Sequence, residues 1–165
     1  MLKEPPARRG FVKLEKFEEL IRLFPTHLQP YVTFLYYCGG RGGEAKLLEW
    51  PQVDLTRRVI RLEGDQTKNE EARHVPLPSR LVDMLAAVEP KQGRVFDTTN
   101  LRKEWQRACT ACGLGTLTPV DGKPYDPIYS GLTLHDFRRS AARNLRRSGI
   151  PETVIMSIGG LTRPA

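Results

Sequence analysis

The stretch LHDFRRSAARNLRRSG, residues 134–149, places five arginines in one short segment. Thr133 followed by Asp136 has the spacing of a capping box, in which two residues three apart cap the start of a helix reciprocally. Gly149 marks the other end, because glycine is common just past the last residue of a helix. The pattern therefore predicts one helix from about residue 134 to near residue 149.

This helix is predicted to be apolar on one side and basic on the other. At about 100° per residue, Leu134, Phe137, Ala141 and Leu145 share one stripe, whereas Arg139, Arg143, Arg146 and Arg147 lie towards the opposite side. We interpret those four arginines as a solvated face and as candidates for contacts with the backbone of DNA.

His135 and Arg138 differ from the other basic residues of this segment. They are three positions apart, so they are neighbours on the helix surface, and they lie at the edge of the apolar stripe. A guanidinium at such an edge is oriented by its surroundings. A His and Arg pair of this kind is more often structural than catalytic, so the segment alone favours the structural interpretation.

Composition and charge narrow the classes of function. The 165 residues suffice for one domain, and 39% apolar with 27% charged residues is an ordinary globular composition. A net charge of +7 favours a polyanionic partner, and nucleic acid is the leading candidate.

The sequence has no long apolar run and no secretory signal, so we expect a cytoplasmic protein without a membrane partner. Cys109 and Cys112 form a C-x-x-C that no second pair completes into a metal site, and we expect both to pack as small apolar residues.

The remaining sequence alternates between helical and extended patterns. Apolar periodicity predicts helices, β-type alternation predicts two strands joined by the polar turn GDQTKNEE, and a Gly/Pro-rich segment is left as a loop. The helices fall at about 17–24, 30–36, 80–88 and 101–112, the strands at 59–62 and 73–77, and the loop at 113–131. We therefore expect an α+β fold, mainly α-helical, with a small antiparallel β-sheet.

A second candidate site is CGGRGGEAKLLEW, residues 38–50, in which Arg41 lies among four glycines before Glu44. Glycines let the backbone approach a ligand closely. Gly40, Gly42 and Ala45 fit a loose dinucleotide-binding pattern, but the preceding segment is predicted to be helical and no acidic residue follows at the expected distance. A P-loop is excluded because G-K-[ST] is missing.

Three motifs in this order resemble the catalytic domain of tyrosine recombinases, the phage-integrase family. The family pattern T-G-x-R-x-x-E is mirrored by residues 38–44 and followed by LLEWPQVDL, which is similar to the family's L-x-W-x-x-V-D. The hairpin motif T-K-N is present at 67–69 with V-P-L at 75–77, and H-x-x-R is present at 135–138. The resemblance covers about residues 10–159.

The resemblance implies roles for five residues in DNA strand breakage and rejoining through a 3′-phosphotyrosine intermediate. Two arginine forks, Arg41 and Arg138, would stabilise charge on the non-bridging phosphate oxygens. Lys68 would protonate the departing 5′ oxygen and His135 would assist proton transfer at the nucleophile. Glu44 would orient Arg41. No metal, cofactor or small-molecule substrate is implied.

The sequence departs from the family pattern near residue 160. Gly160 stands where the family has His or Trp, and the nucleophilic Tyr is expected about nine residues later, past Ala165. We assign none of the tyrosines as nucleophile: Tyr31, Tyr36 and Tyr37 are predicted to be core, and Tyr125 and Tyr129 fall in the predicted loop. We expect residues 1–10 to be a tail and 11–165 a catalytic domain that stops before its nucleophile and is inactive alone.

The expected partners are double-stranded DNA and, for a full-length enzyme, other recombinase protomers in a synaptic complex, as in mobile genetic elements. Two alternatives remain open. RNLRRSGIPETVIMSIGG is compatible with a non-catalytic helix-turn-helix module, which would not require Arg41 to approach Arg138. A degraded recombinase could instead retain only a role in assembly.

Overall fold

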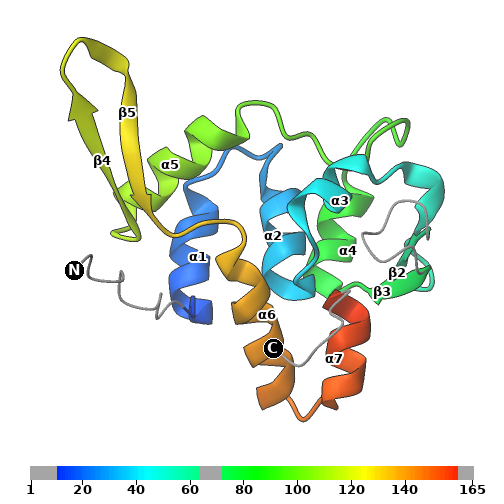
Figure 1. Cartoon of the computed structure of the whole chain (residues 1–165). Coiled ribbons are helices and arrows are strands. Elements are labelled where there is room, and N and C mark those ends of the chain that lie inside the picture. The colour runs from blue at the N-terminus through cyan, green and yellow to red at the C-terminus, as the bar shows by residue number, and fades with distance from the viewer. Residues whose placement is uncertain (1–10, 64–71, 160–165) are drawn as a thin grey trace.

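A computed structural model describes residues 11–63 and 72–159 of the chain. Its elements, in order, are α1 (Leu14–Arg22), α2 (Gln29–Cys38), α3 (Gly42–Leu47), a 3-10 turn (Trp50–Gln52), β1 (Val53–Asp54), β2 (Val59–Leu62), β3 (Arg73–Pro76), α4 (Ser79–Ala86), α5 (Leu101–Ala111), β4 (Gly115–Val120), β5 (Lys123–Gly131), α6 (Asp136–Arg147) and α7 (Glu152–Gly159). The mainly helical α+β fold expected from the sequence is confirmed (Figure 1). In the part of the chain that the structure describes, the helices are too short or too polar to span a bilayer.

Helix α2 lies at the centre of the core. Its side chains are buried around nearly the whole circumference, which is typical of a helix surrounded by other elements. Tyr36 stacks on Phe17 of α1 with ring centroids 3.9 Å apart, and Phe137 of α6 packs edge-on against both rings. These aromatic contacts join α1, α2 and α6, and they bury large apolar surfaces that favour folding.

The first sheet contains three antiparallel strands in the order β1-β2-β3. Ile60 pairs with Val75 and Leu62 with Arg73, so the two predicted strands form the expected hairpin, and the short β1 adds a third strand beside β2. Along β3, buried and exposed residues alternate, which places Arg73 and Val75 on the inward face.

The predicted loop at 113–131 was wrong, because most of this segment forms the antiparallel ribbon β4-β5. Figure 1 shows the ribbon projecting away from the helices. Its strands are joined by Asp121 and Gly122 alone, a two-residue connection typical of a tight hairpin. The strand pattern was hard to recognise in the sequence because the segment contains Pro119, Pro124 and Pro127. Proline is tolerated on edge strands, and both strands of a two-stranded ribbon are edge strands.

The end of α2 is in contact with α6. Gly39 adopts the left-handed conformation at φ 65° and ends α2, and a Cβ atom built on it would lie 2.9 Å from Ala141 Cβ and 3.8 Å from Arg138 Cα. Only glycine supports both the conformation and the close approach. The contact therefore fixes the chain that leads into Arg41 against the helix that carries Arg138.

Replacing Gly39 with alanine should lower the free energy of unfolding by about 2 kcal/mol or more, because the left-handed backbone and the contact with Ala141 both oppose a side chain. Gly43→Ala is the matched control: a Cβ there meets nothing within 4 Å, and the helical position should gain up to about 1 kcal/mol. Urea denaturation of both variants measures the difference, and equal effects would contradict this account of Gly39.

Candidate active site

Arg41 lies in the turn between α2 and α3. It is the N-cap residue of α3, in extended conformation, and its side chain is 29% exposed. Because Gly39 ends α2 against α6, the turn places Arg41 beside the helix that carries Arg138.

Arg138 lies half-buried on the first turn of α6. Burial lowers the pKa of its guanidinium, Arg41 and Arg73 lower it further by charge repulsion, and Glu44 opposes them. These interactions require all four groups to be near one another. The structure therefore brings Arg41, Glu44 and Arg138 together, as the recombinase interpretation requires, and adds Arg73.

Glu44 is the carboxylate shared by this cluster. It is buried on α3, with its Oε2 accepting a 2.5 Å hydrogen bond from Arg73 Nη2 and its Oε1 lying 3.6 Å from Arg41 Nη1. The family resemblance implied that Glu44 orients Arg41, but it did not indicate the closer contact with Arg73. The signal was present, because alternation along residues 73–77 puts Arg73 on the same face as Val75, where a charged residue needs a buried partner.

His135 lies at the start of α6, one turn before Arg138, and is exposed. Its carbonyl oxygen accepts the hydrogen bond from the Arg138 backbone N–H at 3.1 Å. Asp136 fixes this turn, since its carboxylate accepts hydrogen bonds from the backbone and hydroxyl groups of Thr133 at 2.8 and 3.0 Å. Thr133 and Asp136 are thus hydrogen-bonded to each other, but the predicted capping box is wrong in detail: the N-cap is His135, without a side-chain cap hydrogen bond, and the helix begins at residue 136 rather than 134.

Comparisons with known proteins place the chain in a family. The model of the phage integrase family matches residues 12–164. The chain belongs to the phage integrase family. The predicted resemblance is therefore confirmed. No curated protein sequence matches significantly.

Solved structures of integrases and recombinases share the fold. XerA recombinase is 19% identical, with 97% of this chain and 58% of that chain covered at a TM-score of 0.68. The catalytic domain of bacteriophage HP1 integrase is 22% identical, with 93% and 82% covered at 0.67. The integrase of transposon Tn1549 in complex with transposon right end DNA is 14% identical, with 98% and 61% covered at 0.73. The chain thus spans less than two thirds of the XerA and Tn1549 chains.

Two of the predicted site residues lie outside the described residues. They are Lys68, in the connection between β2 and β3, and Gly160, which follows α7. The strands that flank the first connection pair in register from Val59 with Pro76 to Leu62 with Arg73.

The four arginines on the outer side of α6 have different surroundings. Arg143 lies over the ring of Phe11 at 4.4 Å, and Arg146 makes two hydrogen bonds, at 2.9 and 3.0 Å, to the Glu152 carboxylate. Arg139 and Arg147 are exposed. Their predicted contacts with DNA remain predictions. The charge of Arg146 is already matched by its ion pair with Glu152.

Three tyrosines, Tyr31, Tyr36 and Tyr129, are held by hydrogen bonds to backbone carbonyl oxygens. Tyr31 and Tyr36 are buried and donate hydrogen bonds to the carbonyl oxygens of Gly42 and Val12, and burial raises the pKa of Tyr31 to about 12. Tyr129 donates to the carbonyl oxygen of Leu132, and burial raises its pKa. Tyr125 is 97% exposed on the ribbon. Tyr125 and Tyr129 thus lie on β5 and not in a loop.

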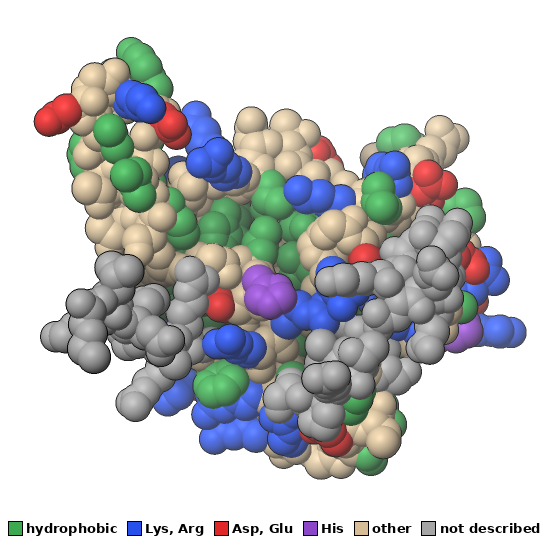
Figure 2. Space-filling view, viewed as in Figure 1, with side chains coloured by type: hydrophobic (Ala, Val, Ile, Leu, Met, Phe, Trp, Pro, Cys, Tyr) green, Lys and Arg blue, Asp and Glu red, His purple; other side chains and the backbone are tan. Residues whose placement is uncertain are grey.

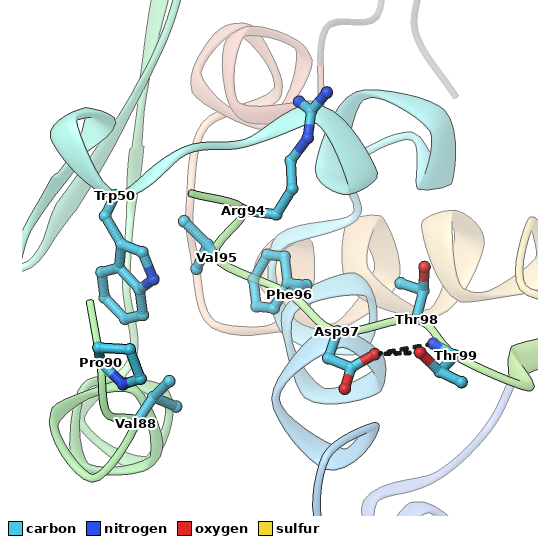
Figure 3. A pocket seen from close by; sticks show the side chains of 9 residues that line it. All are labelled: Trp50, Val88, Pro90, Arg94, Val95, Phe96, Asp97, Thr98 and Thr99. Carbon is cyan, nitrogen blue, oxygen red and sulfur yellow. Dashed lines mark hydrogen bonds between the residues drawn. The ribbon is translucent and has the colours of Figure 1, made fainter. Parts of the chain in front are cut away.

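A hollow of about 500 Å³ lies elsewhere in the domain (Figure 3). Its lining includes Trp50, Phe96, Arg94 and Asp97, and none of the predicted site residues. Arg94 donates a hydrogen bond to the Leu47 carbonyl oxygen, and the Asp97 carboxylate accepts one from the Thr99 hydroxyl at 2.6 Å. Both charged side chains of the hollow therefore already have hydrogen-bond partners within the domain. Within residues 11–63 and 72–159, no group of three or more His, Cys, Asp or Glu could hold a metal ion.

Glu44→Gln should lower the free energy of unfolding by about 3 kcal/mol, because Arg73 would remain buried without its carboxylate. Glu19→Gln is the control: it breaks the exposed pair with Lys16 at 2.8 Å and should leave the denaturation midpoint nearly unchanged. Guanidinium denaturation followed by circular dichroism compares the two. Equal midpoints for both variants would mean that the Glu44 pair contributes no more than a surface ion pair.

Proposed function

We propose that the chain carries the catalytic machinery of a site-specific recombinase that breaks and rejoins DNA through a 3′-phosphotyrosine intermediate. The observation that supports this best is the meeting of Arg41 and Arg138, which are almost a hundred residues apart in sequence, beside one buried carboxylate. In Figure 2, Lys and Arg side chains gather below and to the right of a histidine near the centre of one face. Such a surface suits a phosphodiester backbone.

The proposed chemistry assigns one task to each group. Arg41 and Arg138 bind the non-bridging oxygens of the scissile phosphate, on which negative charge builds as the fifth oxygen bonds to phosphorus. Their half-buried position strengthens this attraction, since it excludes part of the water that would screen it. His135 assists proton transfer at the attacking hydroxyl, and Lys68 protonates the departing 5′ oxygen. Glu44 holds the arginines in place.

The alternative of a helix-turn-helix module gains no support from the arginine cluster. The segment α6-turn-α7 does contain two helices, but such a module needs no approach of Arg41 to Arg138 and no buried carboxylate between them. We propose double-stranded DNA as the partner, and other recombinase protomers as partners of the full enzyme.

The chain should bind duplex DNA with little sequence preference and strong dependence on salt. Each neutralised phosphate lowers the log of affinity by about 0.9 per log unit of salt, so three contacts would weaken binding roughly 40-fold between 50 and 200 mM. Arg41→Ala and Arg138→Ala should each weaken binding roughly tenfold, because a charge-assisted hydrogen bond to phosphate is lost. Arg102→Ala, which removes an exposed arginine from α5, controls for net charge and should have a smaller effect.

Fluorescence anisotropy of a labelled duplex measures these affinities. Binding that is independent of salt, or an Arg102→Ala effect as large as that of Arg138→Ala, would count against a phosphate site at the arginine pair.

The 165-residue chain should form no covalent adduct with a nicked suicide substrate, because arginines lower the barrier of a reaction path only where a nucleophile provides one. Denaturing gels detect the adduct. A chain extended with Gly160→His and a tyrosine about nine residues further on should become able to form it, and in that chain Arg138→Ala should abolish the adduct while Arg147→Ala should not. An adduct of the unextended chain through Tyr125 or Tyr129 would overturn this assignment.

A further inference from the structure

Arg143 on α6 is paired with an aromatic ring instead of a carboxylate. Its guanidinium carbon lies 4.4 Å from the centroid of the Phe11 ring, which is a close cation–π contact. In the part of the chain that the structure describes, Arg143 makes no hydrogen bond and no ion pair. Arg146, three residues later, differs because the Glu152 carboxylate accepts two of its hydrogen bonds. The ring therefore holds the guanidinium of Arg143 without occupying its N–H donors.

The chain at Phe11 is fixed, although the ring is 52% exposed. The next residue, Val12, is buried, and its backbone N–H donates a 2.9 Å hydrogen bond to Ser140 Oγ. Its carbonyl oxygen accepts a 2.8 Å hydrogen bond from the Tyr36 hydroxyl. Ser140 belongs to α6 and Tyr36 to α2, so this segment is anchored to both helices. A ring held in this way restricts the long side chain that stacks on it, and Arg143 is ordered before any ligand binds.

Arg143 lies on the same helix as the proposed phosphate site but at a distance from it. It follows His135 by eight residues, which corresponds to about 12 Å along a helix axis. On the face shown in Figure 2, Lys and Arg side chains continue below the central histidine, with a hydrophobic side chain among them. Each strand of a duplex carries a phosphate about every 3.4 Å of its axis, so phosphates a few nucleotides from the scissile one lie at such a separation.

We infer that Phe11 and Arg143 form a second phosphate-binding point, at which Arg143 contacts the DNA backbone a few nucleotides from the scissile phosphate and Phe11 is its positioning residue. The inference rests on the proposed function. A stacked guanidinium keeps the planar N–H edges that bind phosphate oxygens. Because Arg143 is already ordered, binding costs less side-chain entropy there than at Arg147, which is exposed and stacks on no ring of the described residues.

The test measures duplex affinity and its salt dependence, by fluorescence anisotropy, for single and double variants of the two residues. Arg143→Ala should weaken binding about tenfold and reduce the slope of log affinity against log salt by about 0.9, because one phosphate contact is lost. Phe11→Ala should weaken binding about fivefold with the slope unchanged, because Arg143 keeps its charge but must then be ordered on binding. In the Arg143→Ala background, Phe11→Ala should have almost no further effect.

Arg147→Ala is the matched control for Arg143→Ala. It removes the same charge one turn further along α6, and it should weaken binding only about twofold, through the overall field of the protein. Phe11→Trp keeps an aromatic face and should bind like the unsubstituted chain. Phe11→Leu keeps apolar bulk without that face, so it should match Phe11→Ala, and it carries the same comparison if Phe11→Ala does not fold.

Each other outcome has a defined meaning. If Phe11→Ala weakens binding equally in the Arg143→Ala background, the ring contacts DNA by itself and the inference is wrong. If Arg143→Ala matches Arg147→Ala while Arg41→Ala and Arg138→Ala weaken binding, Arg143 contributes only net charge, and the inference fails while the proposed function stands. If the unsubstituted chain fails to bind duplex DNA at low salt, the proposed function fails first, whatever Arg143 does.

Discussion

The close approach of Gly39 to α6 is the constraint on which the site depends. Helix α2 is buried on nearly all sides, so it cannot shift without opening the core, and its last turn must end where α6 crosses it. Glycine permits that crossing, with 2.9 Å between the position of a Cβ and Ala141. Arg41 follows two residues later and Arg138 precedes Ala141 by one turn. Closing the core therefore also sets the separation of the two arginines.

The electrostatics of the cluster are a consequence of this packing. Burial and neighbouring guanidinium groups lower the pKa of Arg138. The positive charge on Arg138 is therefore less favourable here than it would be in water. Glu44 offsets part of this repulsion. A phosphate would reverse the balance, because its negative charge would enter a partly desolvated place where three guanidinium groups are already assembled. Under the proposed function, repulsion in the free protein becomes attraction for the charge that develops during strand cleavage.

Sequence patterns predicted what depends on local periodicity. The helices around Phe17, Pro30 and Leu101, the hairpin of Ile60 and Val75, and the pairing of Thr133 with Asp136 just before α6 all follow from spacing within a few residues. The ribbon β4-β5 was missed because three prolines obscure its alternation, although Asp121-Gly122 is a hairpin signal. The Arg73–Glu44 pair joins residues 29 apart, and only the inward position of Arg73 pointed to it. Its partner could not be identified without the fold.

The five arginines of residues 134–149 show why charge counts alone cannot locate a site. Arg138 is half-buried among other guanidinium groups, Arg143 lies on an aromatic ring, Arg146 is matched by Glu152, and Arg139 and Arg147 are exposed. One helix thus offers the same side chain in different dielectric and charge environments. What distinguishes Arg138 is the approach of α2 and α3, which deliver Arg41 and Glu44 from residues 38–44. The chemistry of an arginine in this domain is therefore set by the element that packs against it, more than by the basic segment in which it occurs.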